Sequence, residues 1–176
     1  AYAAAGSHGV LETKDGALLL FASARVNMEG GSFPSYYEGR WHHVSLPGAN
    51  YCLRSTDGGQ TWSEPVKMDG PPHADGFPQI LKEVCEICAA ETHDGKILAL
   101  IRPVVSPTVW EAWSHDGGKT WKPMSRGPFP MYASGMISTT SGVLIIGGRF
   151  PGIGVQVSRD GGMTWNFYQV DTANWA

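Results

Sequence analysis

The sequence STDGGQTW at residues 55–62 returns twice, as SHDGGKTW at residues 114–121 and as SRDGGMTW at residues 158–165. Three copies of one motif in a single chain indicate a repeat architecture. The motif aspartates lie 59 and 44 residues apart along the sequence. Spacings of about 40 to 50 residues are typical of four-stranded propeller blades, so the longer first interval is expected to hold an additional loop.

Each motif predicts the tip of a β-hairpin. The Asp-Gly-Gly step favours a tight turn, because a carboxylate accepts backbone N–H bonds and glycine adopts positive φ without steric cost. The Thr-Trp pair that follows favours a strand, with the tryptophan folding back as an apolar anchor. A turn that recurs in every unit is scaffold, whereas a catalytic acid is needed once. We therefore interpret the motif residues as structural: Asp57, Trp62, Asp116, Trp121, Asp160 and Trp165.

The composition favours turn-rich β structure in one domain. The chain has 176 residues, of which 23 are glycine and 12 proline, and only 16% are charged. The net charge of −3 and the absence of a basic run argue against nucleic-acid binding. No apolar stretch is long enough for a membrane span. No cofactor is expected.

Three similar units surround the motifs. Residues 9–25, 86–102 and 135–149 each read as an apolar strand, a short polar turn and a second apolar strand. A third strand leads into each motif, and a fourth follows as SEPVKM, KPM or NFYQV. The sequence thus predicts an all-β fold, a β-propeller with three four-stranded antiparallel blades at roughly 7–68, 80–126 and 131–170. Residues 1–176 would form a single incomplete propeller domain, half of a six-bladed ring. Because open sheet edges invite association, we expect either a homodimer or further C-terminal blades to complete the ring.

Arginine ends the second strand of every unit. Arg25, Arg102 and Arg149 are expected on the rim opposite the motifs, because successive connections in an up-and-down blade alternate between rims. Guanidinium groups match carboxylates in geometry and charge, so such a ring indicates an anionic ligand. A solvated strand end is the alternative reading for any one of them.

The same rim should carry the long loop at residues 26–50, which is rich in functional side chains. Tyr36, Tyr37 and Trp41 are candidate stacking platforms for a carbohydrate, since long loops on a rigid scaffold often hold binding residues. The adjacent pair His42-His43 is interpreted as ordinary surface histidines, and Cys85 and Cys88 as buried unpaired thiols. No metal site is expected.

The motifs and the strand pattern together resemble the Asp-box (BNR repeat) proteins of the sialidase superfamily, over nearly the whole chain. FASAR at residues 21–25 and EICAAETHDGKILALIR at residues 86–102 are similar to two sialidase segments. The resemblance implies that Glu86 orients and deprotonates a tyrosine nucleophile and that Arg102 grips a sugar carboxylate. Sialidases place an acid/base aspartate in the first long loop. This chain has no aspartate between residues 26 and 50, so Glu38 or Glu29 would have to substitute, and Glu38 is the candidate taken here.

Two further departures bear on activity. The arginine-isoleucine-proline phrase that opens the first sialidase blade has no counterpart near residues 6–8, and the nucleophilic tyrosine and last triad arginine belong to later blades. The resemblance implies an exo-sialidase-like glycosidase, acting with retention on an anionic terminal sugar in a secreted or periplasmic setting. The alternatives are a non-catalytic carbohydrate-binding propeller and a protein-binding propeller. In every case Glu86 and Arg102 are expected to meet at the mouth of the central channel, and a purely structural ion pair is the alternative to a ligand-binding role.

Overall fold

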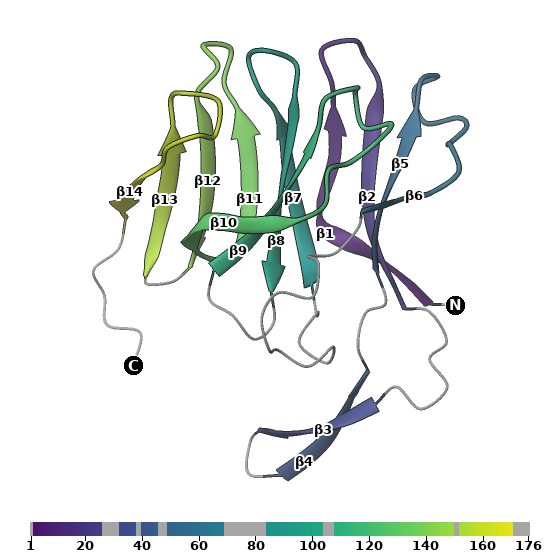
Figure 1. The fold of residues 1–176 in the computed structure, drawn as a ribbon, viewed down its shortest axis with the longest axis vertical. Helices are drawn as coiled ribbons and strands as arrows, with labels where there is room; N and C mark the ends of the chain where they lie inside the picture. The colour runs from purple at the N-terminus through teal and green to yellow at the C-terminus, as the bar shows by residue number, and fades with distance from the viewer. Residues whose placement is uncertain are drawn as a thin grey trace.

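A computed structural model describes residues 2–25, 32–37, 40–45, 49–68, 84–103, 108–149 and 152–170. Side chains are described for residues 9–22, 50–68, 86–102, 108–132, 135–149 and 152–170. Fourteen strands are present within these ranges (Figure 1). They are β1 (Tyr2–Glu12), β2 (Leu18–Arg25), β3 (Ser32–Tyr37), β4 (Arg40–Ser45), β5 (Ala49–Ser55), β6 (Val66–Met68), β7 (Val84–Glu91), β8 (Ile97–Pro103), β9 (Thr108–Ser114), β10 (Ser125–Pro130), β11 (Tyr132–Ser138), β12 (Leu144–Arg149), β13 (Ile153–Ser158) and β14 (Asn166–Gln169).

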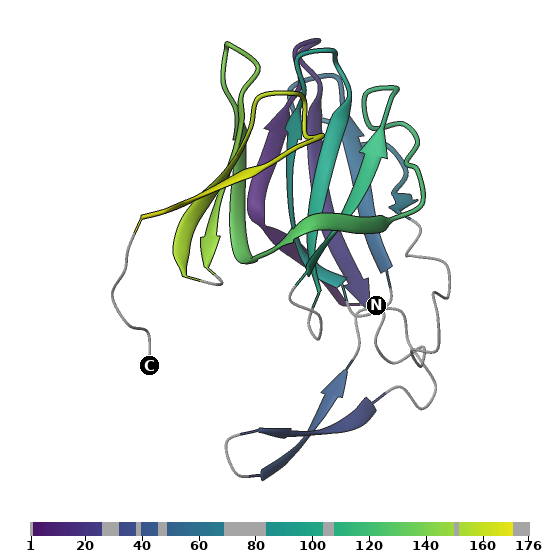
Figure 2. The ribbon, with the colours of Figure 1, turned by 60° about the vertical axis from the view of Figure 1, so that its left-hand side comes forward.

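The strands form three four-stranded antiparallel sheets, in the orders β1-β2-β5-β6, β7-β8-β9-β10 and β11-β12-β13-β14. We call them blades one, two and three. The first strands of the blades lie side by side, with β7 between β1 and β11, and the sheets face one another in series (Figures 1 and 2). The predicted architecture of three four-stranded blades is therefore confirmed. Among the described residues, no helix has the length and apolar character needed to cross a membrane.

Short polar turns join the first and second strands of each blade. In blade two, the hydroxyl of Thr92 donates to Asp94 at 2.6 Å, and Gly95 has φ of +81°. The hydrogen bond fixes the carboxylate in the turn, and the positive φ is a conformation that favours glycine. The resulting hairpins put Glu91 opposite Ile97 and Ser138 opposite Leu144, which sets the register of blades two and three.

Blade two is buried on both faces. Ile97, Ala99 and Ile101 of β8 join a core shared with blade one, whereas Leu98 and Leu100 join a core shared with blade three. Alternate residues of a strand point to opposite faces, so a strand covered on both sides must be apolar throughout, as ILALI is. Each fully buried aliphatic side chain of this kind contributes about 1.5 to 3 kcal/mol to folding.

Three details differ from the sequence predictions. The fourth strand of blade two is β10, beginning at Ser125, and not the preceding KPM segment. The stretch expected to be a long loop contains the hairpin β3–β4, in which Tyr36 stands opposite Trp41. Strand β1 begins at Tyr2, upstream of the expected start of the blade near residue 7.

The blades at the two ends of the stack expose sheet faces as well as sheet edges. Ile137 of β11 is 60% exposed on the face of blade three that points away from blade two, and Tyr168 of β14 is 50% exposed. Blades of a propeller stack face to face, so an end blade exposes the apolar face that a neighbour would cover. Association of two copies stays a prediction, to be checked by the mass in solution.

The described thiols are inert. Cys52 is a free, buried thiol, and Cys88 is buried with its thiol 3.7 Å from the carbonyl oxygen of Leu100. Burial raises the pKa of Cys52 to about 12, so this thiol stays protonated and is a poor nucleophile. The side chain of Cys85 lies outside the described residues, as do those of His42 and His43.

Candidate functional site on the arginine rim

An ion pair joins the ends of β7 and β8 on the rim opposite the motifs. Nη1 of Arg102 donates to Oε1 and Oε2 of Glu86, at 2.8 and 2.6 Å. The two residues lie at the open end of the β7–β8 hairpin, so antiparallel pairing carries both to the same rim. Their side chains are 23% and 29% exposed. The predicted meeting of Glu86 and Arg102 is confirmed, with both groups still in reach of solvent.

A tyrosine from the next blade completes this cluster. The guanidinium carbon of Arg102 lies 5.2 Å from the centre of the Tyr132 ring, within the range of a cation–π interaction. Tyr132 begins β11 and stands directly opposite Arg149 of β12. The guanidinium of Arg102 is thus held by a carboxylate of its own blade and by an aromatic face of the neighbouring blade.

Sequence reasoning missed Tyr132, although a signal for it exists. Tyr2 stands opposite Arg25 in blade one, just as Tyr132 stands opposite Arg149 in blade three. A tyrosine that recurs across from the rim arginine in two blades would have drawn attention to the position. The approach of Tyr132 to Arg102, however, depends on how two blades meet.

The other candidates on this rim are placed only in part. Arg149 is exposed at the end of β12, and Arg25 ends β2, with its side chain outside the described residues. The backbones of Tyr36, Tyr37 and Trp41 lie in the β3–β4 hairpin, but their side chains are outside the described part. Glu38 also falls outside it. The structure therefore brings together Glu86, Arg102 and Tyr132.

The motifs occupy the opposite rim and share one hydrogen-bond pattern. In the second copy, the hydroxyl of Ser114 donates to Asp116 at 2.9 Å and accepts from the N–H of Gly118 at 2.8 Å. The N–H of Thr120 donates to Asp116 at 2.9 Å. The first and third copies repeat each of these contacts within 0.1 Å: 2.8, 2.9 and 2.9 Å in the first, and 2.8, 2.8 and 2.9 Å in the third. Three matching networks far from the arginine rim support a structural role.

Hydrogen bonding keeps the motif carboxylates ionised. The hydroxyl and N–H of Thr61 lower the pKa of Asp57 to about 2, and those of Thr164 do the same for Asp160. At Asp116, partial burial acts to raise the pKa, but hydrogen bonds from Thr120 and Ser114 outweigh it and the net direction is downward. A carboxyl group held ionised in this way is a poor proton donor near neutral pH.

The motif tryptophans are not equivalent, which corrects the expectation that all three are apolar anchors. Trp121 packs edge-on against Phe21 of blade one, with ring centres 5.7 Å apart. Trp165 likewise packs against Phe129 of blade two at 5.1 Å. Trp62 is 36% exposed and its N–H donates to the carbonyl of Gly59. Trp121 and Trp165 therefore each pack against the blade that precedes their own. Trp62 belongs to blade one, and within the described residues no blade precedes blade one.

Comparison with known proteins gives two findings. The BNR/Asp-box repeat family matches residues 53–64, 112–123 and 156–167, the three motif regions. No curated protein sequence matches the chain. The chain therefore carries three BNR/Asp-box repeats, as the sequence indicated.

Solved sialidase structures share the fold. The Hadza microbial sialidase Hz136 aligns with a TM-score of 0.69 and 20% identity, over 94% of this chain and 37% of that one. A mutant of NanB sialidase from Streptococcus pneumoniae aligns with a TM-score of 0.57 and 14% identity, over 97% of this chain and 40% of that one. A mutant of Trypanosoma rangeli sialidase displaying trans-sialidase activity aligns with a TM-score of 0.53 and 17% identity, over 94% of this chain and 28% of that one.

These matches establish the sialidase-propeller fold at low sequence identity. The chain spans well under half the length of each of these structures.

Proposed function

We propose that this Asp-box chain, which has the fold of sialidase propellers, is a sialidase-like glycoside hydrolase module that recognises an anionic terminal sugar on its arginine rim. The observation that carries the proposal is the fixed guanidinium of Arg102, paired with Glu86 and stacked on Tyr132. A guanidinium held in one orientation loses less side-chain entropy when it receives a carboxylate than a free one does.

The charge balance of the cluster supports an anionic ligand. Arg102 and Glu86 offset one another, and exposed Arg149 stands opposite Tyr132, which contacts Arg102. The described side chains of this cluster therefore carry one net positive charge. A ligand carboxylate placed beside Tyr132 would meet guanidinium groups from β8 and β12. Charge-assisted bonds of this kind are among the stronger interactions in proteins.

The chemistry implied by the resemblance gives Glu86 and Glu38 their proposed roles. Glu86 would orient and deprotonate a tyrosine nucleophile supplied by a later blade outside residues 1–176, and Glu38 would serve as acid/base. A neutral phenol avoids the repulsion that an anionic nucleophile would feel beside the carboxylate of the substrate. The step forms a bond from the phenol oxygen to the anomeric carbon and breaks the bond to the leaving group, and water then hydrolyses the intermediate.

Glycan binding without turnover is the second candidate. It is favoured by the engagement of both Glu86 oxygens with Arg102, because a carboxylate that neutralises a guanidinium is a weaker base. An assay with a fluorogenic sialoside separates the two candidates. Release of the fluorophore that is lost in Glu86→Gln supports the hydrolase. Binding without release supports the second candidate.

Arg102→Ala tests the site itself. We expect it to weaken binding of the methyl glycoside of N-acetylneuraminic acid by several-fold to about a hundredfold, since a charge-assisted contact is lost. Binding of methyl β-galactoside should be unchanged, and calorimetry can measure both ligands. Arg159→Ala is the matched control, because it removes an exposed arginine, and so the same charge, from the opposite rim. Equal losses for both sugars, or no binding of the anionic sugar by the unmodified chain, would contradict the assignment.

A further inference from the structure

The junction between blades one and two is closed by a lysine on the motif rim. Lys14 lies in the turn after β1 and reaches across to blade two. Its backbone N–H donates to Oε2 of Glu91 at 2.6 Å. Its ammonium group donates to the carbonyls of Thr92 and His93, at 2.9 and 3.0 Å. Three hydrogen bonds from one residue thus tie the two turns together.

An arginine forms a second bridge at the same junction. Arg54 directly precedes Ser55, the first residue of the first motif. Its Nε donates to the carbonyl of Gly117 in the second motif at 3.1 Å, and its Nη2 pairs with Asp15 at 2.9 Å. The Arg54 side chain is only 16% exposed. Two cationic side chains therefore occupy the junction between blades one and two.

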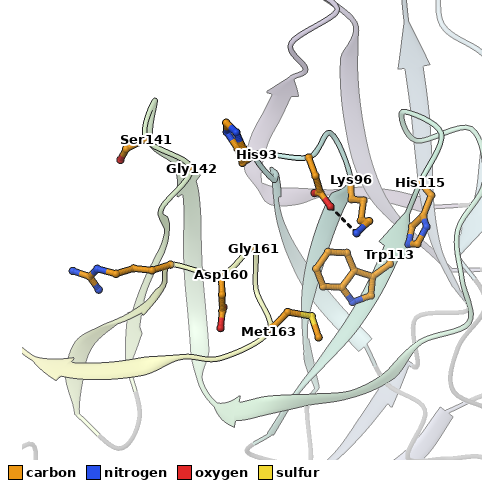
Figure 3. A pocket seen from close by; sticks show the side chains of 11 residues that line it. His93, Lys96, Trp113, His115, Ser141, Gly142, Asp160, Gly161 and Met163 are labelled. Atoms are coloured by element: carbon orange, nitrogen blue, oxygen red, sulfur yellow. Dashed lines mark ion pairs between the residues drawn. The ribbon is translucent and has the colours of Figure 1, made fainter.

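The junction between blades two and three has different residues at the same positions. His93 takes the place of Lys14 in the turn, and Trp113 takes the place of Arg54 before Ser114. In the described part of the chain, no hydrogen bond joins the side chains of His93 and Trp113 to blade three. A cavity of about 540 Å³ lies there, bounded by the turns and motifs of the two blades (Figure 3). This volume is within the range typical of sites for small ligands.

Trp113 and Met163 supply the apolar part of the cavity lining. Trp113 is half-buried and exposes part of its indole, with Met163 beside it and 75% exposed (Figure 3). A Cβ at Gly162 would lie 3.2 Å from the indole Cη2 and 2.9 Å from Leu98 Cδ2, so glycine is needed for the close approach. The indole is therefore held against blade three in a fixed position.

The rim of the cavity is polar and its charges cancel. Lys96 pairs with Asp94 at 2.6 Å, and both residues line the cavity together with Trp113 (Figure 3). Arg159 and Asp160 supply one further charge of each sign. Asp160 stays ionised because hydrogen bonds from Thr164 lower its pKa to about 2. An ion of either sign would therefore gain little from this rim.

An uncharged sugar matches both the apolar and the polar parts of the cavity lining. A pyranose ring presents C–H groups on one face, which can stack on an indole, and hydroxyl groups around its edge, which can bond to polar and charged side chains. Flat aromatic ligands would use the indole but would desolvate the polar and charged groups of the rim without forming hydrogen bonds to them. We propose that the cavity between blades two and three is a second carbohydrate site, which binds a neutral pyranose on Trp113.

This site is independent of the proposed sialidase-like function. It lies on the motif rim, opposite Arg102, and requires a neutral sugar instead of an anionic one. The failure of one proposal therefore leaves the other standing. Arg102→Ala should leave binding at Trp113 unchanged, and variants of Trp113 should leave the affinity for N-acetylneuraminic acid unchanged.

The test uses methyl β-galactoside as the neutral probe and methyl β-glucuronide as its anionic counterpart. The indole N–H resonance of Trp113 is followed by NMR in the unmodified chain and is assigned by its loss in Trp113→Phe. We expect the galactoside to shift this resonance at millimolar concentration. We also expect Trp113→Arg, which copies the junction of blade one, to weaken binding by at least about tenfold. Trp113→Phe keeps an aromatic face and should stay within about threefold of the unmodified chain.

Trp62→Arg is the matched control, because it replaces another tryptophan of the same rim outside the cavity. It should leave galactoside binding intact, and melting temperatures show which variants are folded. The proposal is overturned if the Trp113 resonance does not respond to the galactoside, or if folded Trp113→Arg binds as well as the unmodified chain. A response to the glucuronide alone would overturn the neutral class of ligand.

Discussion

The two rims of this chain differ in how closely their residues repeat from blade to blade. On the motif rim, one hydrogen-bond network recurs in every blade, with matching distances in all three copies. On the other rim, an arginine lies at or near the end of the second strand of each blade, but the two arginines whose side chains are described have different surroundings. Arg102 is paired and stacked, whereas Arg149 is exposed. The residues that repeat in every blade therefore have a structural role. The residues that differ between blades are the ones at which we expect ligand recognition.

The same lesson applies within the motif rim. The motif turns repeat, but the residues that bridge the blades do not, since Lys14 and Arg54 give way to His93 and Trp113. The first junction is bridged by Lys14 and Arg54, and at the second junction Trp113 lines a cavity of about 540 Å³. Variants of the repeated motif residues can show whether these residues have only a structural role.

The largest effect is expected from Gly118→Ala. Gly118 has φ of +85°, and a Cβ there would lie 2.9 Å from two carbons of fully buried Leu19. A strained backbone and overpacking together should lower the free energy of unfolding by about 2 to 4 kcal/mol. Gly117→Ala is the matched control, because its φ is +72° but its Cβ would come no closer than 4.0 Å to Arg54.

The control should cost only the backbone strain, about 1 to 2 kcal/mol. Urea denaturation of both variants measures the difference. Equal losses in the two variants would show that the contact between the second motif and blade one contributes nothing.

A smaller effect is expected from Asp116→Ala. The carboxylate accepts hydrogen bonds from Ser114 and from the N–H and hydroxyl of Thr120. Its loss should lower the free energy of unfolding by about 1 to 3 kcal/mol. Binding of N-acetylneuraminic acid per folded molecule should not change, because Arg102 is on the other rim. Weakened binding with an unchanged melting temperature would mean that the motif takes part in recognition.

The smallest effect is a dependence of stability on acid pH. Hydrogen bonds from Thr61 and Thr164 lower the pKa values of Asp57 and Asp160 from 3.8 to about 2. A lowered pKa stabilises the fold above the unfolded value of 3.8, and this contribution is lost as pH falls towards 2.

The urea midpoint should therefore fall between about pH 5 and about pH 2, and less steeply in the double variant Asp57→Asn with Asp160→Asn. Parallel pH profiles for the variant and the unmodified chain would show that these two carboxylates do not contribute to acid sensitivity.

Local chemistry explains what could be predicted. The Asp-Gly-Gly turns, the Thr-x-Asp-Gly turns and the alternating apolar residues act over a few neighbours, so the strands and their order follow from the sequence. The meeting of Glu86 and Arg102 follows too, because a hairpin fixes its own register. The start of β10 did not follow, since the short KPM segment and the residues after it have similar strand propensities, and pairing with β9 selects Ser125–Pro130.

The sequence by itself determined three blades, two distinct rims and the hairpin that joins Glu86 to Arg102. Only the tertiary structure decided which residues of different blades meet. Tyr132 reaches Arg102, Trp121 reaches Phe21, and Trp113 meets Gly162. Such contacts depend on how one sheet packs on the next. That packing is set by the summed shapes of both buried faces, and no short stretch of sequence encodes it.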